Sequence, residues 1–407
     1  MMIEGSARGE GDATRVSFAV DLFIFVLIGA VAAGVSFVLG AQLAPVLYID
    51  VDLYYGADIN RVFDYMTGGG RFAQFRSTVH PVFTFLLFPP TRSLMGVGLS
   101  PEQAAQAVVA LSAAATASIL YLSARLLELC RVDAILLCLM FIGSATFVFW
   151  WSVPETFPFG GMSVAIALMM PILSRTSLLA WVLASSFALA ITTTNIAAAL
   201  IASAFRLGRF NTLKVALLAT TLVAVLAVWQ KAYLPTSQFF FLPGAFTDEL
   251  SFVSVVNEVG WSLGFGGNLA SFWLAPWVAP DSIMTEAQGI RPVHLSYGVA
   301  GWVALVALLV VFVAAIAALR QEGRLRRLAL IPGLFIGFQF MLHMVYGDEP
   351  FLYAAHFLPA FMVVLALGFL GPLATLCRIA ALIFALVAPL NNVPLFLEAN
   401  ELLVVPT

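Results

Sequence analysis

Charge is the scarcest property of this chain. Only 10% of its 407 residues are Asp, Glu, Lys or Arg, whereas 62% are hydrophobic. A soluble domain carries about 25% charged residues, so the composition excludes an ordinary soluble protein and predicts a chain that crosses a membrane several times. The formal net charge of −3 says little, because in such a chain the side on which a charge lies matters more than the sum.

Cysteine and the common catalytic motifs are also scarce. The three cysteines lie in or beside apolar segments without the spacing of a metal site, so we expect free thiols and no disulfide framework. The sequence contains no Walker loop, no GxSxG elbow and no HExxH or CxxC motif. Any chemistry must therefore come from acids and bases that are dispersed along the chain.

Apolar runs long enough to cross a bilayer predict an all-α bundle of about eleven transmembrane helices, because a span needs about 20 apolar residues. The fifth and sixth runs are short, and we interpret them as one hairpin that is broken around residues 192–195. The predicted helices are at residues 18–39, 101–124, 133–152, 155–173, 177–192, 194–207, 213–232, 298–319, 328–346, 351–370 and 373–390.

Basic residues predict the orientation of the bundle, since cytoplasmic loops are enriched in Lys and Arg. With the N-terminus inside, most of the 19 basic residues lie on the cytoplasmic side and most of the 22 acids lie outside. We therefore expect a multi-pass protein of the cytoplasmic (inner) membrane whose active site faces the periplasm. The expected organisation is a cytoplasmic tail at 1–17, a transmembrane module at 18–232 with an outer loop at 40–100, a long outer loop at 233–297 and C-terminal transmembrane helices at 298–407.

The main polar and aromatic interruption in the first half of the chain covers residues 49–90. Apolar residues at helical spacing from Tyr55 to Met66 predict a short amphipathic helix, suited to the membrane interface and ended by the glycines at 68–70. The apolar run that follows at 81–88 is too short to span a bilayer. It ends at a Pro-Pro pair, so we expect it to lie on the membrane surface or to dip into it.

Two acids, Asp50 and Asp52, open this stretch and admit two interpretations. In an extended segment, residues i and i+2 project to one side, so both carboxylates could serve one site as a general base or as ligands of a divalent cation. Alternatively, Asp52 caps the following helix and Asp50 is solvated. A DxD pair alone is a weak motif, and the sequence slightly favours the second interpretation.

Glu155 stands in a Val-Pro-Glu-Thr step between two predicted helices. The dipole of a helix stabilises a carboxylate in its first turn, which is a sufficient structural reason for an acid at this position. At the outer end of a helical hairpin, however, Glu155 also lies at the depth of the first outer loop. It could therefore act with Asp50 and Asp52, either as a second catalytic acid or as a third ligand if a cation binds.

Basic side chains in the first outer loop could bind a phosphate. Arg76 and His80 share a face in either a helical or an extended conformation, and Arg61 and Arg71 lie nearby in sequence. An arginine that reaches lipid headgroups is the simpler alternative. His356 is predicted a short way into an outer-leaflet helix, where an ionisable group usually faces the bundle interior or a watery cavity.

The order of these features resembles the GT-C superfamily of polyprenyl-phosphate-sugar-dependent membrane glycosyltransferases. The resemblance covers residues 18–207 well and the C-terminal half only loosely. Its landmarks are an outer loop with acids after the first helix, a Pro-acid step between the third and fourth helices, and a late segment similar to the family's Arg/His-Tyr-Leu-Pro segment. The matching stretches are Asp50-Val51-Asp52, His80-Pro81-Val82-Phe83, residues 99–105, Pro154-Glu155 and residues 353–359.

The resemblance implies a sugar donor on an undecaprenyl- or decaprenyl-type phosphate and a glycan or glycolipid acceptor. An acid of the first outer loop would deprotonate the acceptor hydroxyl, which would attack the anomeric carbon directly with inversion. That role falls on Asp52 first and on Asp50 second, with Glu155 as the family's second acid. The residues that would bind the donor phosphate are Arg76, His80, His356 and Arg61.

Two other functions fit a helical bundle of this kind. An O-antigen polymerase or ligase would also join lipid-linked glycans and would depend on the loop at 233–297. A lipid or solute transporter or flippase would place ionisable groups or broken helices near the membrane midplane, whereas most acids here are predicted at outer helix ends. We expect membrane lipids as neighbours and no nucleic-acid partner, and a divalent cation is left open.

Overall fold

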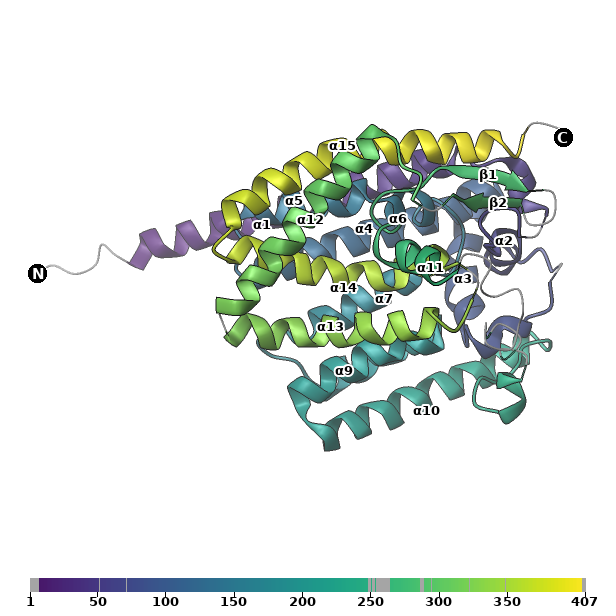
Figure 1. The fold of residues 1–407 in the computed structure, drawn as a ribbon. Coiled ribbons are helices and arrows are strands. Elements are labelled where there is room, and N and C mark those ends of the chain that lie inside the picture. The colour runs from purple at the N-terminus through teal and green to yellow at the C-terminus, as the bar shows by residue number, and fades with distance from the viewer. Residues whose placement is uncertain are drawn as a thin grey trace, which may run out of the picture.

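The computed structural model of the chain describes residues 7–50, 52–70, 72–247, 250, 253, 264–285, 289–293, 295–321, 323–347 and 349–404. In these residues there are fifteen α-helices and one pair of short β-strands. The long helices run along one common axis, and most of the loops gather at one end of the bundle together with the strands (Figure 1). We call this the loop-rich end; helix α1 begins at the opposite end.

Seven of the described helices are long and apolar enough to cross a membrane, and three more are apolar but shorter. They support the predicted all-α, multi-pass bundle, although fewer helices reach full length than the predicted number. The long helices are α1 (Ala7–Gly40), α4 (Pro101–Leu126), α10 (Arg209–Tyr233), α12 (Val299–Gln321), α13 (Gly323–His343), α14 (Ala354–Ala366) with its flanking 3₁₀ turns η6 (Pro350–Tyr353) and η7 (Leu367–Leu370), and α15 (Ala374–Glu401). The shorter helices are α7 (Phe157–Met169), α8 (Leu178–Ile191) and α9 (Ile196–Leu207).

The prediction of a single helix at 133–152 is wrong. The structure divides this segment into α5 (Arg131–Gly143) and α6 (Ala145–Trp150). Ser144 between them is extended, with φ −69° and ψ 151°, and its hydroxyl oxygen accepts a hydrogen bond from the backbone of α6. The break therefore has a local cap, but it also needs partners for the helical donors that it frees.

A loop from the C-terminal half supplies those partners. The backbone N–H groups of Ala145 and Thr146 donate to the carbonyls of Trp277 and Pro276, each at 3.0 Å. Asn392, fully buried in α15, donates to the same Trp277 carbonyl at 3.0 Å. Non-helical backbone is tolerated at membrane depth when protein surrounds it in this way, so the break depends on this long-range contact as well as on its local cap.

The break predicted between the fifth and sixth helices is confirmed. Helix α8 ends before Thr192, which is extended with φ −153° and ψ 127°, and a 3₁₀ turn, η3 (Thr193–Asn195), leads into α9. The other described 3₁₀ turns are η1 (Pro45–Tyr48), η2 (Phe75–Thr78) and η4 (Pro243–Phe246).

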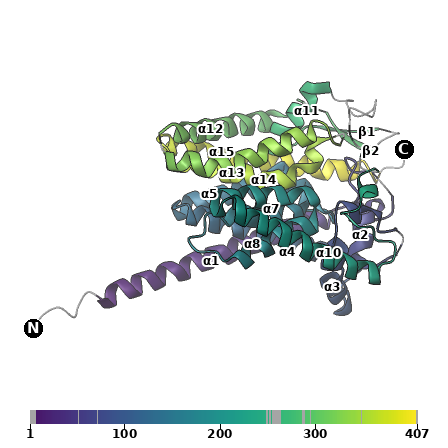
Figure 2. The same ribbon diagram turned by 90° about the horizontal axis from the view of Figure 1, so that it is seen from below.

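The bundle has two layers, which are seen most clearly from below (Figure 2). Helices α12 to α15 form one layer, and α1, α4, α5, α7 and α8 form the other. Helix α14 packs against α7 across the two layers, and all of its residues except Val364 are buried. A Cβ atom on Gly161 of α7 would lie 2.6 Å from the Ala355 carbonyl oxygen, so this close approach requires glycine.

The loop-rich end contains the amphipathic helix predicted from the apolar stripe. It forms α2 (Ile59–Thr67) and ends at Gly68, whose φ of 76° fits a left-handed cap, so its existence and its end are confirmed. All nine of its residues are buried, however, because η1, α3 and α4 pack around it. Its surface is therefore covered by the protein itself rather than by lipid. The other elements of this end are α3 (Phe83–Gly96), α11 (Gly264–Trp273), β1 (Ser282–Thr285) and β2 (Gly289–Pro292).

The two strands pair with each other and also fasten the segment between α1 and α2. The Ile290 N–H donates to the Leu53 carbonyl at 2.8 Å, and the Tyr55 N–H donates back to the Ile290 carbonyl at 3.2 Å. A Cβ atom on Gly289 would lie 2.4 Å from the Leu53 oxygen, so glycine is needed there too. The long loop at 233–297 is therefore joined to the first loop by backbone pairing, which the sequence did not predict.

The apolar run at 81–88 does not end at its Pro-Pro pair. It continues as α3 through Pro89 and Pro90, so the predicted end is wrong. Proline has no N–H, and the carbonyls of Phe85 and Leu86, four residues earlier, therefore receive no hydrogen bond from the prolines. Both prolines are exposed, and the 14-residue helix is about 21 Å long at 1.5 Å per residue, too short to span.

Candidate functional site

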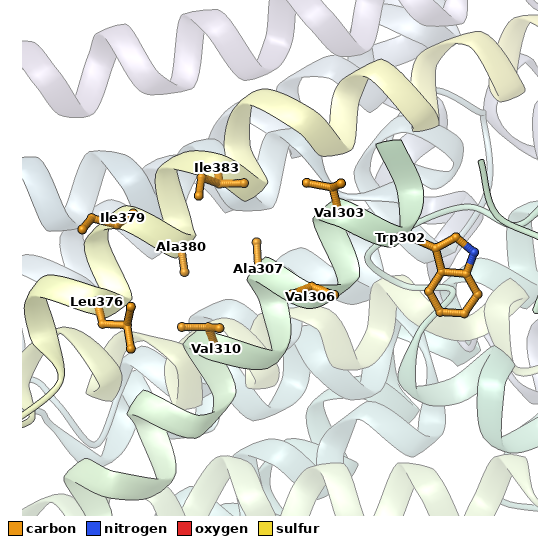
Figure 3. A pocket seen from close by; sticks show the side chains of 9 residues that line it. All are labelled: Trp302, Val303, Val306, Ala307, Val310, Leu376, Ile379, Ala380 and Ile383. Atoms are coloured by element: carbon orange, nitrogen blue, oxygen red, sulfur yellow. The ribbon is translucent and has the colours of Figure 1, made fainter. Parts of the chain in front are cut away.

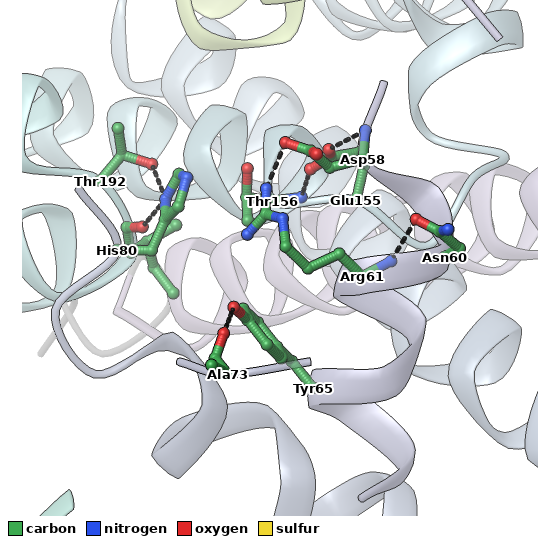
Figure 4. Close-up of polar contacts among 10 residues, drawn as sticks. Asp58, Asn60, Arg61, Tyr65, Ala73, His80, Glu155, Thr156 and Thr192 are labelled. Atoms are coloured by element: carbon green, nitrogen blue, oxygen red, sulfur yellow. Dashed lines mark hydrogen bonds and ion pairs between the residues drawn. The ribbon is translucent and has the colours of Figure 1, made fainter. Parts of the chain in front are cut away.

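Glu155 lies at the centre of a polar cluster at the loop-rich end. It follows α6, and only 2% of it is exposed. One carboxylate oxygen accepts a hydrogen bond from the backbone N–H of Asp58 at 3.0 Å, and the other accepts one from the N–H of Thr156 (Figure 4). Asp58 immediately precedes α2. Glu155 thus joins the α6–α7 connection to a segment 97 residues earlier in the chain.

Arg61 reaches the same cluster from the first turn of α2. Its Nη2 donates to the Asp58 carboxylate in an ion pair, and only 4% of the arginine side chain is exposed. Its Nε and Nη1 are buried and have no hydrogen-bond partner among the described residues. The guanidinium carbon also lies 5.4 Å from the Tyr65 ring and 5.7 Å from the Phe75 ring. A buried cation with two unused donors is suited to binding an anion.

The charged groups in this cluster shift one another's pKa values. Burial and the neighbouring Asp58 raise the pKa of Glu155, whereas the positive charge of Arg61 opposes that rise. Burial disfavours the charged form of Arg61, but the Asp58 carboxylate outweighs it and raises the pKa of Arg61, so the guanidinium stays charged. The site therefore combines a permanent cation with a carboxyl group that holds its proton more tightly than usual.

Asp52 lies close enough to this cluster for its charge to interact with it. Partial burial and then the charge of Asp58 raise its pKa, while Arg291 and Arg61 oppose the rise. Asp50 is exposed, and its backbone N–H donates to the Val46 carbonyl at 2.9 Å at the end of η1.

The assumption that this segment is extended is wrong. Asp52 has a left-handed φ of 58°, and Asp50 follows a 3₁₀ turn. The alternative interpretation is also wrong for Asp52, because Asp58 is the residue at the N-cap position of α2. Val51 and Arg71 lie outside the described residues.

His80 lies on the other side of the Arg61 side chain from Glu155 in Figure 4. Its Nδ1 is 2.8 Å from the Ile191 carbonyl oxygen and 3.3 Å from the Thr192 hydroxyl. The buried surroundings of the ring, followed by the charges of Arg76 and Arg61, hold the pKa of His80 well below its ordinary value. The ring is therefore neutral at physiological pH and lies within electrostatic reach of both arginines.

His356 enters the cluster from α14, where it is buried. Its Nδ1 is 3.0 Å from Asn195 Nδ2, at the end of η3. A Cβ atom on Gly160 of α7 would lie 2.3 Å from the His356 ring, so the ring is seated against a glycine. Three elements, α7, η3 and α14, therefore fix this histidine in place.

The structure brings together six of the seven residues selected from the sequence. Contacts or mutual charge effects connect Asp52, Glu155, Arg61, Arg76, His80 and His356, whereas Asp50 faces solvent outside the cluster. Among the described residues, no three His, Cys, Asp or Glu side chains gather as a metal-binding set, so Asp50, Asp52 and Glu155 do not form the tentative cation site.

Two residues that sequence reasoning did not assign a role belong to the site. Asp58 is at its centre, and its signal is a Gly-Ala-Asp step immediately before an amphipathic stripe. Asn195 orients His356, and its signal is an amide inside the break of a short apolar hairpin. Neither signal could be read as a site, because each depends on a partner about 100 residues or more away along the chain.

A hollow elsewhere in the molecule is lined by none of these residues. It is a groove of about 380 Å³ between α12 and α15 (Figure 3). Its lining is entirely apolar, so it offers nothing to an acid–base reaction. The lining residues are Trp302, Val303, Val306, Ala307, Val310, Leu376, Ile379, Ala380 and Ile383.

A comparison of the chain with protein-family models finds no match, and a comparison with curated proteins finds none either. The residues of the cluster and their geometry are therefore what indicates a function for this chain.

Proposed function

We propose that this chain is an integral-membrane glycosyltransferase that transfers a sugar from a polyprenyl-phosphate donor to the hydroxyl of a glycan or glycolipid acceptor. The transfer takes place at the outer face of the cytoplasmic membrane. The observation that carries the proposal is Arg61, a buried cation with two unused donors beside the carboxylates of Asp58 and Glu155. A departing lipid phosphate needs charge stabilisation, and an attacking hydroxyl needs a base. The order of motifs similar to the GT-C superfamily supports the same function.

Asp58 and Asp52 are the candidates for the base, because Asp52 is exposed and the Asp58 side chain is 41% exposed, while Glu155 is buried. The base takes the proton of the acceptor hydroxyl while that oxygen forms a bond to the anomeric carbon. In the same step the bond between the anomeric carbon and the phosphate oxygen breaks. Polyprenyl phosphate leaves with the electron pair, and the configuration at the anomeric carbon is inverted.

The remaining residues bind the donor phosphate or position the base. Arg61 and Arg76 neutralise the phosphate as its charge develops, and His356 faces the same region from α14. Glu155 holds the backbone of Asp58 through the 3.0 Å hydrogen bond, so it acts as a positioning residue. The apolar surroundings strengthen these interactions because the local dielectric is low.

The test is the release of polyprenyl phosphate from a synthetic polyprenyl-phosphate sugar in the presence of candidate acceptors. Replacement of the base, in Asp58→Asn or Asp52→Asn, is expected to lower turnover by about 10²–10⁴-fold. Asp50→Asn is the matched control, because it makes the same chemical change two residues from Asp52 and outside the cluster. Full turnover in both Asp58→Asn and Asp52→Asn, with unchanged thermal unfolding, contradicts the proposal.

A transporter is the second candidate, and the break between α8 and α9 favours it. Interrupted helices with polar groups are typical of substrate sites in transporters, and here Asn195 lies in the break and contacts His356. Movement of a labelled lipid or solute across vesicles that contain the protein, without release of polyprenyl phosphate, would support the transporter.

A further inference from the structure

The position of the proton on His80 follows from its hydrogen bond to the backbone. The Ile191 carbonyl can only accept, so the ring nitrogen that lies 2.8 Å from it must donate. Because the ring is neutral, the proton is on Nδ1 and the lone pair is on Nε2. Nε2 is therefore a hydrogen-bond acceptor, and it has no partner among the described residues.

His356 has the opposite arrangement. Asn195 Nδ2 also lies 3.2 Å from the Gly160 carbonyl, which fixes the amide with its NH₂ toward that oxygen. The same NH₂ must then donate to His356 Nδ1, since an amide nitrogen does not accept. In its neutral form His356 therefore carries its proton on Nε2 and presents a donor where His80 presents an acceptor.

This difference separates the ligands that each ring can take. A polyprenyl-phosphate sugar is a phosphodiester, and its phosphate oxygens only accept hydrogen bonds. They can bind Arg61, Arg76 and the donor of His356, but they are repelled by the lone pair of His80. The hydrogen-bond donors on such a molecule are the hydroxyl groups of its sugar, which is attached directly to the phosphate.

We propose that His80 is a specificity-determining residue that accepts a hydrogen bond at Nε2 from a hydroxyl of the transferred sugar, and that it does not bind the phosphate. The proposal rests on the proposed transferase function and adds the recognition of a hydroxyl group of the sugar beside the arginines. It reverses the role that the sequence predicted for His80.

The first experiment compares donors in which each sugar hydroxyl is replaced in turn by hydrogen. The wild-type chain is expected to use one of these deoxy donors at least about tenfold less well than the parent, because a site built to hydrogen-bond a hydroxyl discriminates against its absence. His80→Asn keeps an N–H toward Ile191 but has no group in place of Nε2, so it is expected to lose that discrimination and use both donors equally. The same assay is repeated with acceptors that lack each hydroxyl in turn. If the wild-type chain discriminates against a deoxy acceptor and His80→Asn does not, His80 recognises the acceptor, and the assignment to the transferred sugar is overturned.

The second experiment reads the tautomers directly and does not depend on turnover. In the full chain labelled with ¹⁵N-histidine, His80 is expected to show a protonated Nδ1 and an unprotonated Nε2, and His356 the reverse. Asn195→Asp replaces the donor with an acceptor, so it is expected to move the His356 proton to Nδ1 and leave His80 unchanged. A proton on Nε2 of His80 in the wild type would overturn the proposal.

The two experiments separate the possible failures. A protein that uses the donors but shows the same deoxy-donor discrimination in His80→Asn as in the wild type contradicts the role of His80 and leaves the transferase intact. A protein that uses no polyprenyl-phosphate sugar at all, with His80 in the expected tautomer, contradicts the transferase and with it the sugar as the ligand of His80.

Discussion

The cluster at the loop-rich end has a counterpart that joins α1, α4 and α5, and α1 begins at the opposite end of the bundle (Figure 1). In the first half of α1, Asp21 accepts hydrogen bonds from Tyr121 at 2.9 Å, from Arg125 at 3.1 Å and from Arg131 at 2.9 Å. The acid is 25% exposed, and the two arginine side chains are 27% and 35% exposed. Each charge here has opposite charge and water around it, which suits a connection between α1, α4 and α5.

The cluster at the loop-rich end uses the same residue types differently. Arg61 is almost fully buried, yet it has one ion pair, with Asp58, and two donors without a partner among the described residues. Buried donors without partners destabilise a fold, so they persist where a ligand completes them. The comparison teaches that burial and incompleteness, rather than the presence of an ion pair, distinguish the candidate site from a structural contact.

The largest expected difference between the two clusters is the loss of turnover when an arginine of each is replaced. Arg61→Met is expected to lower turnover by about 10²–10³-fold, because it removes preorganised charge stabilisation of the departing phosphate. Arg125→Met makes the same substitution at the other end and is expected to leave turnover unchanged. Release of polyprenyl phosphate measures both, and equal losses in the two variants would show that the ends do not differ in function.

A smaller effect is expected at Glu155. Glu155→Gln keeps the shape of the side chain but removes the charge that accepts the Asp58 N–H, so turnover should fall by about 10–100-fold. If Glu155 is a positioning residue, the pH profile of the remaining activity should also lose one ionisation. A variant with unchanged turnover and an unchanged profile would show that Glu155 is a structural acid like Asp21.

Stability and turnover are both expected to depend on pH through the proton of Glu155. Because the pKa of Glu155 is raised, its protonated form stabilises the fold; this contribution is complete below the ordinary glutamate pKa and is lost as the pH rises through the raised value. Turnover should change in the opposite direction and increase over the same pH range. Since the charge of Arg61 lowers the pKa of Glu155, Arg61→Met should move the rise in residual turnover to higher pH. A pH–rate profile of each variant measures the shift, and a shift to lower pH would contradict the arrangement.

The smallest effect is expected at the Asp21 cluster, where the acid is paired with two arginines. Asp21→Asn should reduce the free energy of unfolding by about 1 kcal/mol or less, because partly exposed ion pairs contribute little, and turnover should not change. Thermal unfolding of the purified chain measures the first quantity, and release of polyprenyl phosphate measures the second. Loss of turnover without loss of stability would place a second functional site at this end.

The sequence predicted features that depend on local pattern. The lengths of the apolar runs located the seven long apolar helices, and the spacing from Tyr55 to Met66 with Gly68 located α2 and its end. The features that it missed depend on contacts between distant residues. The break at Ser144 is completed by a loop more than 100 residues later, and strand β2 has only four residues, too few for a period to be recognised.

In the candidate site, too, the features that depend on local pattern were predictable and those that depend on distant residues were not. Residue type and predicted depth were enough to select Glu155, Arg61 and His356 from the sequence. The role of His80 was not predictable, because the tautomer depends on the carbonyl of Ile191, 111 residues away. Asp58 was not selected because the hydrogen bond that fixes its backbone in the site comes from Glu155, 97 residues later in the chain.

The backbone pairing of Leu53 and Tyr55 with Ile290 has a consequence for synthesis of the protein. A ribosome delivers the acids and Arg61 early and delivers Ile290 and His356 late, so the nascent chain waits for most of its length before the first loop obtains its partner strand. A product truncated before Ile290 would contain every carboxylate assigned to the chemistry. It would lack the strand that fastens Leu53, the neighbour of Asp52, and we expect such a fragment to be inactive although its acids and Arg61 are all present.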